Sequence, residues 1–381
     1  MKTPTDFRQW PLLLASTLTV MAGAALAPAL PTLQAEFADT PNVDFLTRQL
    51  LTVPALFIVL AAPLAGWLVD RVGRVPLLVA SILLYVTAGS VGGLLDRLDL
   101  ILASRALLGV AVAGLMTSVT TLIADYFDGT FRERVFGRQG AFMSFGGVVF
   151  LIGGGLASDL HWRATFLVYT VPVILLWWVA RLPEPRVTQP LSVVATARLP
   201  RVKVGLIYGA GLTGMMMFYV IPVQLPYRLV ELAGTTGTAT GFILALSNIA
   251  GTVSGLLFAR LRRHLNPLQI ITLVYVLMAS GYLLIGLAQD IVTVLCGLAL
   301  AGFGLGMTVP NLSAWLSSFT PPEMRGRMMG GLTAAVFIGQ FVSPLAAQPF
   351  VNAYGTAGPF LAGSALLGLL AVLAWGLRNR A

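Results

Sequence analysis

Residues 50–89 read LLTVPALFIVLAAPLAGWLVDRVGRVPLLVASILLYVTAG. Two mainly apolar runs flank the short charged turn Asp70–Arg74, and each run is long enough to cross a membrane as an α-helix of about 20 residues. Stretches of the same kind recur along the chain, so we predict an all-α membrane protein with twelve transmembrane helices. The predicted helices cover residues 10–32, 46–66, 76–95, 100–123, 138–158, 164–181, 204–224, 241–259, 268–288, 291–316, 328–350 and 357–377.

The composition excludes several classes of protein. Hydrophobic residues make up 57% of the chain and charged residues 10%, whereas a soluble domain has about 45–50% and about 25%. A soluble enzyme or a nucleic-acid binder is therefore excluded, and we expect no enzymatic activity. The single cysteine, Cys296, lies in an apolar run, and no phosphate-binding loop occurs. We expect no disulfide, no metal site, no cofactor and no drive by ATP hydrolysis.

The basic residues indicate how the chain is oriented. With twelve helices and a cytoplasmic N-terminus, 19 of the 24 Lys and Arg residues fall on the cytoplasmic side and four on the opposite side, while Arg105 lies inside a helix. Cytoplasmic loops carry such an excess of positive charge. We therefore predict a multi-pass membrane protein with both termini in the cytoplasm. An uncleaved first helix is expected rather than a signal peptide.

The two halves of the sequence repeat short patterns. Arg132 begins the spacing R-x4-G-x8-G, and Arg325 begins the same spacing 193 residues later. Such internal repeats are typical of transporters built from two six-helix halves around a midplane site. We predict an N-terminal half at residues 1–182, a proline-rich cytoplasmic linker at 183–203 and a C-terminal half at 204–381.

The charged turn resembles a signature of the major facilitator superfamily, in its bacterial branch of twelve-helix drug/proton antiporters. The family pattern G-x-L-A-D-R-x-G-R-K is met in order, with Val69 and Val75 as departures. The resemblance implies the major facilitator fold, a place in the bacterial inner membrane, and a loop that latches the two halves on the cytoplasmic side. From the residues alone, a glycine at 66 permits close helix contact and one at 73 a tight turn. The predicted latch residues are Gly66, Asp70, Arg71, Gly73 and Arg74.

Two further family patterns are met in part. In the fourth helix the resemblance associates Arg105 with proton transfer, although Leu108 replaces the family's glutamine. The alternative is that Arg105 only snorkels, with its apolar stem in the membrane and its charged end in water. The fifth helix lacks the family's Gly-Pro step, which has a counterpart in the eleventh helix. The predicted helix-packing or rocking residues are Gly137, Gly146, Gly154, Gly155 and Pro344; the glycines alternatively serve tight helix packing only.

The expected solute cavity has few charges. No carboxylate lies mid-helix in the first, fourth, seventh or tenth predicted helix, so proton coupling is implied by the resemblance but not by the residues. Asp44, Asp70 and Asp125 are the nearest acids, and we expect Asp125 to be a solvated loop acid beside Arg132 and Arg134. The candidate cavity residues are Thr117, Met217, Tyr219, Asn248, Asn311 and Gln340; each has interhelical hydrogen bonding as its alternative role.

These observations predict a secondary active transporter that works by alternating access. The favoured activity is efflux of small organic, drug-like or amphipathic molecules by a monomer in the lipid bilayer, with coupling to protons left open. Export of sugars or metabolites is the alternative within transport. A non-transporting receptor or a lipid-handling protein on the same scaffold is the alternative from another class.

Overall fold

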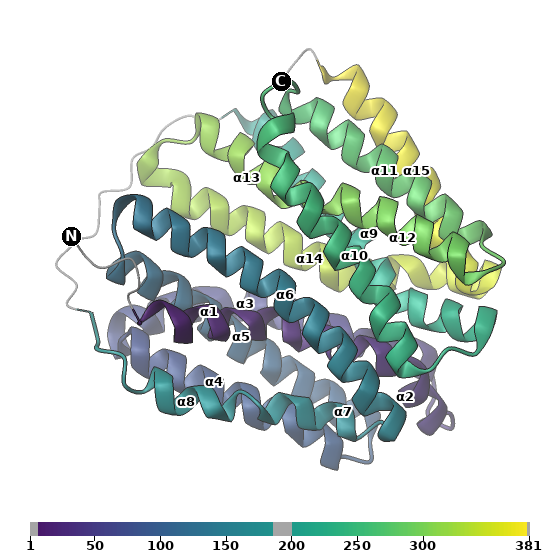
Figure 1. The fold of residues 1–381 in the computed structure, drawn as a ribbon, viewed down its shortest axis with the longest axis horizontal. Coiled ribbons are helices and arrows are strands. Elements are labelled where there is room, and N and C mark those ends of the chain that lie inside the picture. The colour runs from purple at the N-terminus through teal and green to yellow at the C-terminus, as the bar shows by residue number, and fades with distance from the viewer. Residues whose placement is uncertain (1–6, 186–199, 379–381) are drawn as a thin grey trace. The chain divides into compact units, whose positions relative to one another are not determined.

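The computed structural model describes residues 7–185 and 200–378, and within these ranges the chain forms helices and no strands. Most of the predicted linker, residues 186–199, lies outside the described residues. The chain divides into two compact units (Figure 1). Unit 1 contains residues 1–189 with 236–242, and unit 2 contains residues 190–235 with 243–381.

Unit 1 begins with a broken apolar helix and continues through four long helices to a second broken one, drawn from purple to teal in Figure 1. Pro28 and Pro172 lie at the two breaks, where their missing N–H groups interrupt the helical hydrogen bonds. The elements are α1 (Gln9–Ala24), η1 (Ala27–Ala29), α2 (Leu30–Glu36), α3 (Val43–Val72), α4 (Arg74–Val91), η2 (Gly92–Leu94), α5 (Leu98–Tyr126), α6 (Gly129–Leu160), α7 (Ala164–Leu167), η3 (Val168–Thr170) and α8 (Val173–Val179).

Unit 2 also forms six helical segments, but in its described residues only the fourth is broken, at Met307 between α12 and α13. The first six residues of α10, 237–242, are grouped with unit 1. The elements are α9 (Arg201–Ala233), α10 (Gly237–Leu261), α11 (Pro267–Leu287), α12 (Ile291–Gly306), α13 (Thr308–Phe319), α14 (Pro322–Tyr354), η4 (Gly355–Ala357) and α15 (Gly358–Gly376).

The prediction of twelve membrane-crossing segments is confirmed. In the described residues, seven single helices (α3, α4, α5, α6, α9, α10 and α11) are long and apolar enough to cross, as are the broken segments α1–α2 and α12–α13. The stretch Met324–Gly376 is 53 residues long and contains two segments, α14 and α15, while α7 to α8, at Ala164–Val179, form a shorter apolar segment. Two predicted starts are wrong, because α6 begins at Gly129 and α14 at Pro322. Hydropathy marks the membrane-embedded part of a helix, whereas the backbone hydrogen bonds continue into the charged residues beyond it.

The same helix pairs pack in both units. In unit 1, α1 packs on α6, and α4 packs on α5 and α8; in unit 2, α9 packs on α14, and α11 packs on α12 and α15. A buried tyrosine repeats at equivalent places. The Tyr85 hydroxyl on α4 donates to the Leu18 carbonyl of α1 at 2.8 Å, and the Tyr282 hydroxyl on α11 donates to the Met217 carbonyl of α9. The internal repeat is therefore one of packing as well as of sequence.

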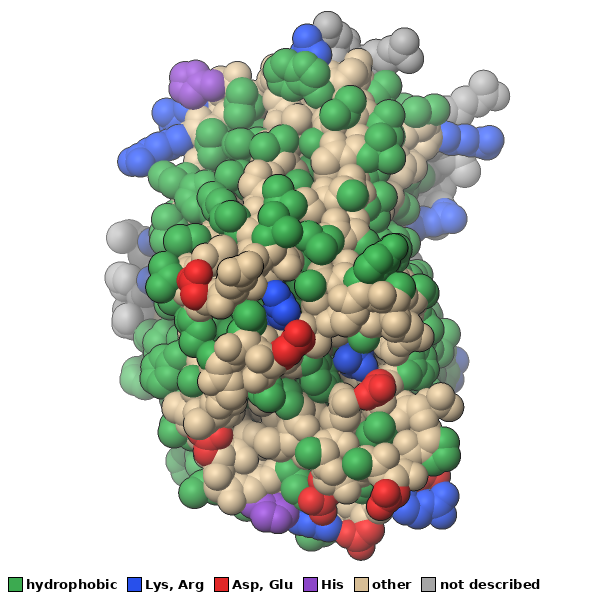
Figure 2. All heavy atoms as spheres, turned by 90° about the vertical axis from the view of Figure 1, so that its right-hand side faces the viewer, with side chains coloured by type: hydrophobic (Ala, Val, Ile, Leu, Met, Phe, Trp, Pro, Cys, Tyr) green, Lys and Arg blue, Asp and Glu red, His purple; other side chains and the backbone are tan. Residues whose placement is uncertain are grey.

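Large apolar side chains remain on the outside of the helices. Leu60 on α3, Trp177 on α8, Leu256 on α10 and Val372 on α15 are each more than half exposed. Figure 2 shows hydrophobic side chains over much of the surface in view, with charged ones few and scattered. This distribution matches a helix bundle whose surroundings are lipid.

Candidate functional site

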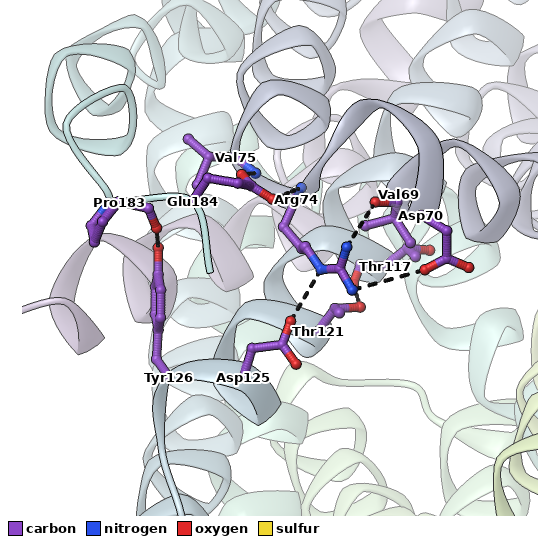
Figure 3. A network of polar contacts seen from close by, with 10 residues as sticks. All are labelled: Val69, Asp70, Arg74, Val75, Thr117, Thr121, Asp125, Tyr126, Pro183 and Glu184. Carbon is purple, nitrogen blue, oxygen red and sulfur yellow. Dashed lines mark hydrogen bonds and ion pairs between the residues drawn. The ribbon is translucent and has the colours of Figure 1, made fainter. Parts of the chain in front are cut away.

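The turn between α3 and α4 is closed by a glycine and an acid from far along the chain. Gly73 has φ +102°, a backbone conformation that residues other than glycine rarely adopt. The Glu184 carboxylate accepts hydrogen bonds from the Arg74 N–H at 2.7 Å and the Val75 N–H at 2.9 Å (Figure 3). It thus caps the N-terminus of α4, where a negative charge is favourable. A Cβ on residue 73 would lie 3.0 Å from Glu184 Oε1.

Arg74 is the centre of the polar network in Figure 3. Its side chain is 11% exposed, and its Nε donates to Asp125 Oδ2 at 3.1 Å, from the last turn of α5. Nη1 donates to the Val69 carbonyl at 3.3 Å, whereas Nη2 lies 3.9 Å from Asp70 Oδ1. Asp125 is thus not the expected loop acid: it lies in the last turn of α5 and keeps contact with solvent while its carboxylate pairs with a nearly buried guanidinium.

Asp70 is held more loosely than Asp125. Its side chain is 70% exposed, against 28% for Asp125, and it makes only the 3.9 Å ion pair among its interactions in the described residues. At such exposure an ion pair of this length contributes little to stability. The network therefore leaves one carboxylate of the turn facing solvent, while the arginine beside it is fixed by the other.

The remaining two predicted latch residues lie on the exposed side of α3. The Arg71 guanidinium lies 4.5 Å from the centre of the Trp67 ring, a cation–π contact. A Cβ on Gly66 would meet no atom within 4 Å among the described residues. The expected close helix contact at Gly66 is therefore not formed in this structure.

The end of the last segment of unit 1 is fastened to α5 as well as to α4. The Tyr126 hydroxyl donates to the Pro183 carbonyl, next to Glu184, and the Arg8 guanidinium lies 4.8 Å from the centre of the Tyr126 ring. Glu184 and Tyr126 were missed in the sequence analysis, which treated Pro183 and Pro185 only as linker residues. An acid directly after an apolar segment was the available signal, but it does not name the helix that is capped.

Arg105 is completely buried inside unit 1. Its Nη2 donates to the Gly89 carbonyl of α4 at 2.6 Å, and the guanidinium faces the rings of Phe166 and Tyr169 at 5.1 and 4.7 Å. Nε and Nη1 have no hydrogen-bond partner in the part of the chain that the structure describes. The alternative of a side chain extending to water is wrong, because carbonyl oxygens and ring faces surround the charge instead.

The glycines of α6 differ in their surroundings. A Cβ on Gly146 would lie 2.8 Å from Thr17 Cβ, and one on Gly154 would collide with the Ala25 backbone, so both allow α1 to approach α6 closely. Gly155 packs in the same way against Gly237 of the same unit, whereas Gly137 has open space around it. In unit 2, Pro344 lies inside α14, which continues through it.

The candidate cavity residues divide into packed and partly accessible ones. Asn311 is fully buried and donates to the Pro267 carbonyl at 3.0 Å, which is the bonding expected between packed helices. Thr117 donates to the Ala113 carbonyl of its own helix at 2.8 Å.

The other candidates of unit 2 lie on α9, α10 and α14. The Tyr219 hydroxyl of α9 and the Gln340 side chain of α14 are near each other. Met217 lines a cavity of about 210 Å³ between α9, α14 and α15. Asn248 on α10 is partly exposed.

Twelve membrane-crossing segments in two units of equal packing, with a charged turn capped in the first unit, define a multi-pass membrane protein of the transporter class. The family model of the Major Facilitator Superfamily matches residues 12–344 and 207–381. The chain therefore belongs to the Major Facilitator Superfamily, and the resemblance in the charged turn is confirmed.

Curated relatives of this chain include efflux and resistance proteins. The chain is 28% identical over 355 residues to the class C tetracycline resistance protein of Escherichia coli, covering 86% of each chain. It is 33% identical over 217 residues to the multidrug efflux pump LfrA of Mycolicibacterium smegmatis; that match covers 52% of this chain and 42% of the pump.

Solved structures show the same fold at low sequence identity. A D-xylose-proton symporter superposes with a TM-score of 0.80 at 16% identity, over 97% of this chain and 96% of the other. The human organic anion transporter MFSD10 has a TM-score of 0.68 at 19% identity, over 97% and 100%. At these identities the likeness shows the fold alone, which is the one these transporters share.

Proposed function

We propose that this transporter exports small organic molecules of drug-like or amphipathic character across the bacterial inner membrane by alternating access. The relatives that match by sequence are a tetracycline resistance protein and a multidrug pump. The observation that carries the proposal is the capped α3–α4 turn, in which Arg74 is fixed by Asp125 while the Asp70 carboxylate stays 70% exposed. A retained turn of this kind favours transport over a non-transporting receptor.

In this proposal Asp70 is the latch. Its exposed carboxylate is free to meet positive helix ends or arginines of the other half in the outward-facing state, where such a contact contributes about 1 kcal/mol. Losing it shifts the balance between the two states about fivefold. The position of Asp70 depends on the conformation of this turn, which is held by the contacts of Arg74, Asp125 and Glu184.

Efflux is tested in a host that lacks its own drug exporters. Cells expressing the parent should survive higher concentrations of tetracycline and ethidium and accumulate less ethidium, while Asp70→Asn should lose most of this protection at equal expression. Asp128→Asn, which changes another exposed acid at the start of α6, is the matched control. Uptake or efflux of labelled xylose without any effect on drugs would support the sugar alternative and contradict the proposal.

The proposed orientation has its own test. After Cys296→Ser, single cysteines at Arg201 and Arg262 should react with an impermeant reagent only in inverted vesicles, and those at Glu36 and Asp290 only in intact cells. The basis is the distribution of basic residues, 19 against four. Reaction of the Arg262 position in intact cells would contradict cytoplasmic placement of that loop.

A further inference from the structure

A cavity of about 540 Å³ lies within unit 2 between α9, α11 and α15. Its wall runs from Val202 to Thr213 on α9, from Leu268 to Tyr275 on α11 and from Leu370 on α15 to Leu377 just after it. Among the described residues no charged side chain lines it, and its volume is within the range of about 300–1,000 Å³ that small-molecule sites occupy. None of the residues discussed for the turn or for Arg105 belongs to it.

The length of this groove matches one leaflet of a membrane. Val202 and Thr213 are eleven residues apart on α9, which is about 16 Å along the axis at 1.5 Å per residue. Half of a hydrocarbon core about 30 Å thick is about 15 Å. An acyl chain entering at the Val202 end would therefore reach the Thr213 end.

The groove is open at its side and floored by glycines. Val202 is 77% exposed and Leu373 54%, so its rim reaches the surroundings of the helices. Gly205 and Gly209 lie on its α9 wall, and a Cβ on either would meet no atom within 4 Å. The missing side chains leave room for a ligand that enters from the bilayer.

At the Thr213 end of the groove, two hydroxyl groups are already hydrogen-bonded. Thr213 Oγ1 donates to the Gly209 carbonyl at 2.8 Å and lies 3.0 Å from the Tyr275 hydroxyl. Either hydroxyl can be the donor in this contact, so at least one of the two protons is already used within the pair. The other described residues at this end, such as Ala210 and Ile271, are apolar, so the end suits a hydrocarbon chain.

The other end of the groove is cationic. Arg201 precedes Gly205 by one helical turn, and Lys203 precedes Leu206 by three residues, so both flank the lining face of α9. Arg378 follows Ala374 of the α15 wall by four residues. Residues 200–206, 262–268 and 372–378 contain no acid. Basic pockets between transmembrane helices bind the head groups of anionic lipids.

We propose that this groove binds one anionic phospholipid of the leaflet at the arginine-rich end. One acyl chain lies along Gly205 and Gly209, and the phosphate lies among Arg201, Lys203 and Arg378. None of the candidate solute-cavity residues lines this groove, so the proposal stands or falls independently of the efflux activity.

Native mass spectrometry of the purified full-length chain in detergent tests the site. Phosphatidylglycerol and phosphatidylcholine with the same acyl chains are the probes. We expect one retained phosphatidylglycerol per chain, bound at least fivefold more tightly than phosphatidylcholine. Gly209→Leu fills the groove and should weaken retention of both lipids at least tenfold. Gly368→Leu, at a glycine of α15 that likewise has open space but does not line the groove, should leave retention unchanged.

A second variant separates the head group from the chain. Arg201→Gln with Lys203→Gln should reduce phosphatidylglycerol binding to the level of phosphatidylcholine and leave the latter unchanged. Equal retention by Gly209→Leu and Gly368→Leu, or equal binding of the two lipids by the parent, would overturn the proposal. If Gly209→Leu abolished drug efflux while lipid retention stayed the same, the groove would be a solute site and the lipid assignment would be wrong.

Discussion

Removing the Glu184 carboxylate should loosen the first turn of α4. Both carboxylate oxygens accept backbone N–H groups, from Arg74 at 2.7 Å and Val75 at 2.9 Å, so Glu184→Ala leaves two helix N-terminal donors without their partner. Replacing a capping side chain by alanine costs typically about 1 kcal/mol, and losing an acid from a helix N-terminus costs about 0.3–1 kcal/mol.

The expected magnitude is at the lower end of that total. Glu184 is exposed, so water replaces part of the lost interaction, and we expect the local opening free energy to fall by about 1 kcal/mol. A change of this size makes local opening about fivefold more frequent. Gly73 can keep its positive φ in the variant, because glycine adopts this conformation without support from Glu184. The rest of α4 should therefore keep its stability.

Hydrogen exchange of the Arg74 and Val75 amides measures this opening directly. Both amides should exchange about fivefold faster in Glu184→Ala, and to an intermediate extent in Glu184→Gln, which keeps one acceptor oxygen. Glu133→Ala, at an exposed acid on α6, is the control and should leave them unchanged. Parental exchange at both amides in Glu184→Ala would refute the capping role.

Three further predictions concern single residues. Asp125→Asn removes the close partner of Arg74 and should lower the free energy of unfolding by about 1 kcal/mol more than Asp128→Asn does, measured by chemical denaturation in detergent; equal values would mean that the pair is not stabilising. Arg105→Lys keeps the charge but loses the planar guanidinium between two rings. If Arg105 works in coupling, transport in reconstituted vesicles should fall below about a tenth of the parental rate, a loss of about 1.4 kcal/mol at the limiting step; near-parental transport would exclude this role. The Thr293 N–H donates to Asp290 and holds the pKa of that carboxyl below its ordinary value of 3.8, so the cap of α12 is fully formed above that value and is lost as pH falls through the lower folded pKa. Exchange of the Thr293 amide, corrected for its intrinsic pH dependence, should lose protection only in that acidic range, and Asp290→Asn should remove the pH dependence.

The sequence by itself determined the number of membrane-crossing segments and the twofold repeat. Hydropathy over about 20 residues is a local property, and the bilayer demands it wherever a helix crosses. The same locality made Gly73 predictable as a turn residue, because its positive φ depends on its own backbone. Helix ends were predicted less well, as at Gly129 and Pro322, because charged residues can continue a helix outside the membrane.

Only the tertiary structure decided which polar groups meet. Glu184 and Arg74 are 110 residues apart in sequence, and Asp125 is 51 residues from Arg74, so their contacts depend on how α4, α5 and the end of the last segment of unit 1 pack. Arg105 was recognisable as an intramembrane charge, yet its burial against Phe166 and Tyr169 was not. The groove of unit 2 likewise arises where three helices separated in sequence leave space beside two glycines. Such features follow from packing between distant segments, and the pattern along any one helix does not contain that information.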